Sequence, residues 1–99
     1  MPKHNFSHLL AHYPETIEEM DEMFTSHQFI LKLAQQHQRL YIKALHSYRD
    51  EPAPFRTVHG ILAKRLHDYP RLIELVRRDA TSTNIFGQSK QCSEWRRLK

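Results

Sequence analysis

The chain has 99 residues, which is enough for one hydrophobic core and too few for two. Its 39% hydrophobic and 26% charged residues, with only two glycines, are typical of a globular domain that favours helix. It has no apolar run of about 18 residues and no uninterrupted apolar signal-peptide core, which predicts a cytoplasmic protein without a membrane partner. The single cysteine, Cys92, excludes an internal disulfide and a multi-cysteine zinc site.

The net charge of +4 is unevenly distributed along the chain. Residues 1–24 hold one basic and five acidic residues, whereas residues 25–99 hold 14 lysines and arginines against six acids. The basic part attracts polyanions, and its contact with phosphates would release counterions from nucleic acid. Many basic proteins bind no nucleic acid, so the charge favours this class of partner without establishing it.

The chain begins with an acidic extension, residues 1–25, that is predicted to contain a short helix starting near Pro14. Ahead of that helix, His4, His8 and His12 are spaced by four residues, so one helix would place the three imidazoles on one face. Two histidines four residues apart on a helix can share a zinc, nickel or copper ion, but no carboxylate or cysteine completes an obvious set of ligands. We therefore interpret these histidines as solvated or packed on the core, and we expect no metal and no cofactor.

The next helical region covers residues 26–48. Thr25 and Ser26 offer an N-cap, because a hydroxyl oxygen accepts hydrogen bonds from the free amides of a first turn. Either one long helix spans the region or it breaks near 36–38. We favour the break, because two shorter helices suit a compact small domain.

A central helix over residues 55–67 follows two prolines, at a large angle to its predecessor. At about 100° per residue, one side carries apolar residues, namely Val58, Ile61, Leu62 and Leu66. The opposite side carries small, basic or hydrogen-bonding residues, namely Arg56, Thr57, Gly60, Ala63, Lys64 and His67. Glycine costs roughly 1 kcal/mol relative to alanine inside a helix, so Gly60 needs a reason. Either this face approaches another molecule closely, as a recognition helix approaches a major groove, or Gly60 and Ala63 lie under a neighbouring helix.

The C-terminal part is predicted to be a hairpin. The apolar run after Pro70 either extends a helix or forms a strand. The polar stretch 79–91 is predicted to be a loop. Residues 92–98 alternate so that Trp95 turns inward, and pairing them with 72–78 gives a hairpin with a long basic tip.

Several features together resemble a winged helix-turn-helix domain over residues 26–98. They are three helices, the hydroxyl-bearing start at 56–58, the run Ile61-Leu62-Ala63-Lys64-Arg65-Leu66, the segment 72–78, and a polar loop before a strand with tryptophan. The resemblance implies a mainly α fold with a small C-terminal β-hairpin and a winged-helix-like three-helix core. In that family the recognition helix enters the major groove, and the wing reaches a neighbouring groove or the backbone.

The same resemblance implies which residues contact nucleic acid. The groove face would consist of Arg56, Thr57, Lys64 and His67. The residues that flank the hairpin and favour phosphates would be Arg77, Arg78, Lys90, Arg96 and Arg97.

No glycine-rich phosphate loop, nucleophile elbow or paired-carboxylate signature appears, so we expect no enzyme. The first hypothesis is a DNA-binding domain, such as a small transcriptional regulator, that binds double-stranded DNA alone or as a homodimer. The second is a small helical protein-interaction or adaptor domain, in which residues 79–95 and the acidic extension contact a protein partner.

Overall fold

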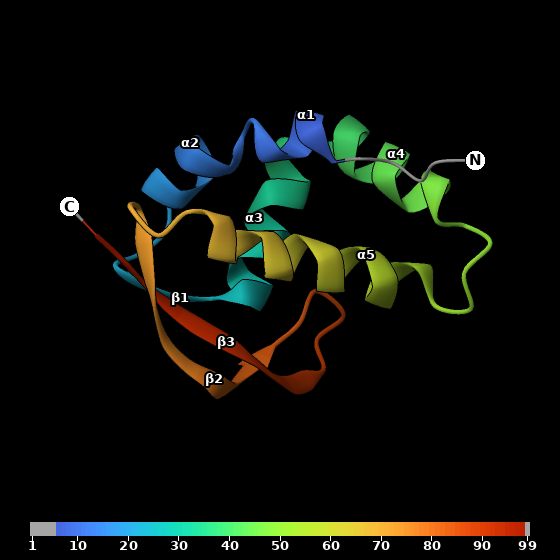
Figure 1. Cartoon of the computed structure of the whole chain (residues 1–99). Coiled ribbons are helices and arrows are strands. Elements are labelled where there is room, and N and C mark those ends of the chain that lie inside the picture. Colours follow the sequence, from blue (N-terminus) through green and yellow to red (C-terminus); the bar gives the residue numbers. More distant parts are fainter. Residues whose placement is uncertain (1–5, 99) are drawn as a thin grey trace.

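The computed structural model describes residues 6–98, which form helices packed on one side of an antiparallel sheet (Figure 1). The α-helices in this range are α1 (Ser7–Leu10), α2 (Tyr13–Glu18), α3 (Ser26–Gln36), α4 (Gln38–Ser47) and α5 (Pro54–Lys64), and a 3₁₀ helix, η1 (Arg65–Asp68), follows α5. The strands are β1 (Met23–Thr25), β2 (Ile73–Thr83) and β3 (Ser89–Arg97), in the order β1-β3-β2. Helices α1, α2 and α4 lie farthest from the sheet, and α5 crosses in front of α3. No helix among the described residues is long and apolar enough to span a bilayer.

The expectation of a mainly α fold with a small C-terminal hairpin and a three-helix core is wrong. Residues 6–98 contain five α-helices and three strands, and β2 and β3 are 11 and 9 residues long. The stretch 79–91 is mostly strand, because the link between β2 and β3 is only residues 84–88. Its hydroxyl and amide residues pair across the ladder, as Thr81 does with Gln91. Backbone hydrogen bonds hold such a ladder whatever its side chains, so a strand exposed on both faces shows no apolar alternation.

Strand β1 comes from the acidic extension and pairs with β3, with Phe24 opposite Trp95. The extension also supplies Phe6, Leu9 and Tyr13 to the same buried cluster as α3 and α5. The expected division into 1–25 and 26–98 therefore falls inside one sheet and one core.

The predicted helix cap and helix break are both confirmed. Thr25 caps α3: its Oγ1 accepts a hydrogen bond from the Gln28 amide at 3.2 Å, and its own amide donates to Gln28 Oε1 at 2.9 Å. The helix breaks at His37, whose φ of −131° and ψ of 57° lie outside the helical region. This break turns the chain so that α4 packs against α3 instead of continuing it.

The core holds α5 by apolar contacts and one buried hydrogen bond. Val58 and Leu62, together with Leu66 of the following η1, are 0% exposed. The Tyr13 hydroxyl donates to the Leu62 carbonyl at 2.6 Å, and burial raises the pKa of Tyr13 far above its usual range, which keeps this donor protonated. Trp95 turns inward from β3 as predicted, and its indole N–H donates to Ser26 Oγ at 3.2 Å.

The hydrogen bond from α2 to α5 can be tested with Tyr13→Phe, which removes the hydroxyl and keeps the ring. We expect the free energy of unfolding in urea to fall by about 1–3 kcal/mol, because the buried Leu62 carbonyl loses this donor. Tyr69→Phe removes a longer bond, 3.1 Å to the Leu10 carbonyl at a part-buried position, and should cost less. An unchanged stability of Tyr13→Phe would contradict this account.

Candidate nucleic-acid interface

The side of α5 opposite its buried stripe faces solvent. Arg56, Gly60 and Lys64 are exposed, as is His67 in the following η1, while Thr57 and Ala63 are half-buried. A Cβ atom built on Gly60 would meet no atom within 4 Å. The structure therefore contradicts the interpretation in which Gly60 lies under a neighbouring helix.

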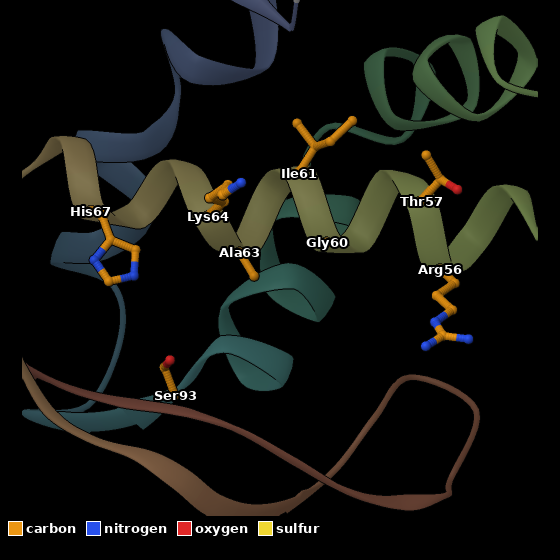
Figure 2. A pocket seen from close by; sticks show the side chains of 8 residues that line it. All are labelled: Arg56, Thr57, Gly60, Ile61, Ala63, Lys64, His67 and Ser93. Atoms are coloured by element: carbon orange, nitrogen blue, oxygen red, sulfur yellow. The ribbon is translucent and has the colours of Figure 1, made fainter.

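This face borders a surface hollow of about 560 Å³ between α5 and β3. The hollow is lined by Arg56, Thr57, Gly60, Ile61, Ala63, Lys64, His67 and Ser93. Figure 2 shows Arg56 and Ala63 of α5 and His67 of η1 pointing toward the hairpin, and Ser93 pointing back from β3. His67 is held there by an edge-to-face contact with Trp95, at 4.8 Å between ring centroids.

A second hollow of about 830 Å³ continues from the first, between α5, the start of α3 and the hairpin. The two share Arg56, Gly60, Ala63 and Ser93. The second hollow adds Arg78 and Lys90 from the two strands. We refer to the two hollows together as the basic groove.

The basic groove carries an unneutralised positive charge. Its lysine and arginine side chains are Arg56, Lys64, Arg78 and Lys90. No aspartate or glutamate is among its lining residues, and none of the ion pairs within residues 6–98 involves these four cations. A concave surface lined by one sign of charge concentrates the opposite charge, so the groove is suited to an anion.

Three predicted phosphate-contacting arginines lie outside the groove and contact the protein itself. Arg77 pairs with Glu94, 3.2 Å from Nε to Oε1, and the Arg96 guanidinium pairs with the Glu74 carboxylate. Arg97 donates from Nη1 to a backbone carbonyl of α2, at 3.3 Å. Glu94 and Arg96 alternate along β3 with the residues that face α5, which turns them to the other side of the sheet.

The hairpin tip closes one end of the groove. The Asn84 Oδ1 atom accepts hydrogen bonds from the amides of Phe86 and Gln88, and Gly87 supplies the positive φ of 79° that this turn needs. The Phe86 ring meets Phe55 edge to face, with centroids 4.9 Å apart. This contact fixes the tip against the first turn of α5.

No family model, curated protein or solved structure matches the chain. The chemistry of the groove is therefore inferred from its own residues.

Sequence reasoning missed His59, which lies on α5 between two aromatic rings. Its Nε2 is 2.5 Å from the Tyr41 hydroxyl, and its ring stacks on Tyr41 and Phe86. Burial lowers the pKa of His59, with a smaller contribution from His27, and burial raises the pKa of Tyr41 to about 12. The uncharged His59–Tyr41 pair thus supports the tip contact without adding charge to the groove.

Ser93 was also missed, although the predicted alternation placed it on the same side of the final strand as Trp95. Cys92 is half-buried and lines the groove beside it. The Ser93 hydroxyl and, more weakly, the Cys92 thiol can each donate or accept a hydrogen bond from a ligand in the groove.

The two weak metal candidates within residues 6–98, His8 and His12, do not lie on one helix. His4 lies outside the described residues, and His8 is exposed on α1, which ends at Leu10. His12 instead contacts the Glu15 carboxylate and stacks on the His37 ring, which the spacing of the N-terminal histidines did not indicate.

The environment of His59 can be tested by its titration. We expect NMR of the His59 ring to give a pKa below 6.5, because burial disfavours its protonated form. Since the unfolded chain then binds this proton more tightly, the contribution of His59 to stability is complete above pH 6.5 and is lost as the pH falls below it. A midpoint at or above 6.5 would show that the ring is not buried as described.

Proposed function

We propose that this chain is a non-enzymatic, cytoplasmic DNA-binding domain that applies α5 and the hairpin to double-stranded DNA. The observation that carries the proposal is the uncovered Gly60 face, bordered by cations that have no ion-pair partner within residues 6–98. Free cations release counterions from a duplex when they replace them at phosphates.

The shape of this face suits a helix in a major groove. Gly60 and Ala63 keep the surface of α5 low at its centre, so the backbone can approach base edges closely. Arg56 and Lys64 flank this centre and reach phosphates or guanine edges. Arg78 and Lys90 stand on the hairpin, where they would bind the adjacent backbone. Because α5 and the two hairpin strands line one groove, they would contact a duplex together, which favours a duplex over small anions.

A protein-interaction domain is the second candidate. Phe55 and Phe86 are 43% and 51% exposed at the closed end of the groove, where they offer an apolar contact. This candidate predicts no affinity for duplex DNA even at low salt.

The contribution of the groove cations to DNA affinity can be tested by fluorescence anisotropy with a mixed-sequence duplex. We expect affinity to fall steeply as salt rises, and each lost phosphate contact in Arg56→Ala and Lys64→Ala to reduce the slope of log K against log salt by about 0.9. Lys43→Ala, which removes an exposed cation of α4 outside the groove, is the matched control and should bind as the wild type does. No binding at low salt, or equal losses in all three variants, would contradict the proposal.

The same assay can test substitutions of Gly60, because a Cβ atom at this position meets open space. Gly60→Ala should keep DNA binding, because one methyl group fits without contact and favours the helix. Gly60→Glu should also fold, but its carboxylate would stand among the groove cations and repel phosphates. Wild-type affinity of Gly60→Glu would show that DNA does not approach this face.

A further inference from the structure

A separate cluster of metal-ligating side chains lies between α2 and the α3–α4 break. Its members are His12, Glu15 and His37, and none of them lines the basic groove. We propose that this cluster binds a divalent transition-metal ion, preferably zinc, and that the bound ion ties the N-terminal segment to the helix break.

The three donor atoms already lie close together. His12 Nδ1 is 2.5 Å and His37 Nε2 is 3.4 Å from the same oxygen, Glu15 Oε1. The two imidazole rings are stacked, with centroids 3.7 Å apart and planes at 20°. All three donor atoms lie within 4.8 Å of one another. Tetrahedral zinc, with bonds of about 2.0–2.2 Å, holds its donors roughly 3.4 Å apart. Binding therefore requires the Glu15 carboxylate to move away from His12, and the two stacked rings to turn so that both nitrogens face the ion.

The donor types select the class of metal. Two imidazole nitrogens and one carboxylate oxygen are a set that zinc uses when it keeps a fourth position for water. A hard ion such as calcium or magnesium prefers oxygen donors, so the two histidines disfavour it. The side chains of His12, Glu15 and His37 are 36%, 56% and 17% exposed, which leaves a path for the ion and room for a bound water.

The backbone under the donors is well supported. The His12 carbonyl accepts hydrogen bonds from the Thr16 hydroxyl at 2.8 Å and the Thr16 amide at 3.1 Å. The His37 amide donates to the Leu33 carbonyl and its carbonyl accepts from the Tyr41 amide, both at 3.0 Å. Donors held on fixed backbone lose little freedom when the ion arrives.

The position of the cluster links zinc binding to the packing of the N-terminal segment on the core. His12 and Glu15 flank Tyr13, the residue that donates the buried hydrogen bond to α5. An ion that joins α2 to His37 would hold this segment on the core, and a ligand that binds only the folded state raises its stability.

The test is calorimetric titration of zinc into the full chain after treatment with a chelator. We expect one ion per chain and a higher melting temperature with zinc. His12→Ala and His37→Ala should each lose at least roughly tenfold in affinity, since even outer-shell changes at metal sites cost 10–100-fold. His8→Ala removes an exposed histidine of α1 outside the cluster and should bind as the wild type does.

A measurement on the unmodified chain guards against variants that fold poorly. On adding zinc, the ring signals of His12 and His37 should shift in NMR spectra while that of His8 stays in place. Absence of saturable binding, ring shifts that omit His37, or wild-type affinity of His37→Ala would overturn the proposal.

Discussion

The burial of one stripe of α5 is the constraint on which the rest of the site depends. Val58 and Leu62 of α5 and Leu66 of η1, which follows it directly, are fully buried, so the rotation of the helix about its axis is fixed by the core. The positions half a turn away, including Gly60 and Lys64, must then face solvent. The N-terminal segment reinforces this orientation through the Tyr13 hydrogen bond to the α5 backbone. Segments far apart in sequence thus set the direction in which the basic side of α5 points.

The hairpin turns this exposed face into a groove. Trp95 anchors β3 in the core, while Phe86 holds the tip against the start of α5. Between these two contacts, the strands stand away from α5 and leave an open space. Arg78 and Lys90 face this space from the strands, and Arg56 faces it from the helix. Two other arginines of the hairpin, Arg77 and Arg96, are paired with Glu94 and Glu74 on the far side of the sheet. The unpaired cations Arg78 and Lys90 therefore face α5.

Much of the helical part could be predicted from the sequence, because helices with a buried stripe show a period near 3.6 residues. The cap at Thr25, the break near His37 and the inward turn of Trp95 each have a local signal, and each is confirmed. Strand β1 has only three residues, which is too short for any period to show. The full length of β2 and β3 was missed because backbone pairing, and not apolar alternation, holds their outer halves.

The candidate site could be predicted only in part. The basic face of α5 follows from one helical period, whereas the partners of Arg77 and Arg96 depend on the cross-strand register, which shifts near Arg77. The contact between His12 and His37 joins two helix ends with no shared period, so the sequence gives no signal for it. Helix faces, caps and breaks can therefore be predicted from this sequence, whereas contacts between residues far apart in the chain cannot.

The central claim is that the Gly60 side of α5 and the facing hairpin form one binding surface for a duplex. Amide chemical-shift mapping of the labelled chain, titrated with a short DNA duplex at low salt, tests it most directly. We expect the largest changes at Gly60, Ala63, Lys64 and Lys90. Changes confined to α2 and α4, or no changes at any residue, would contradict it.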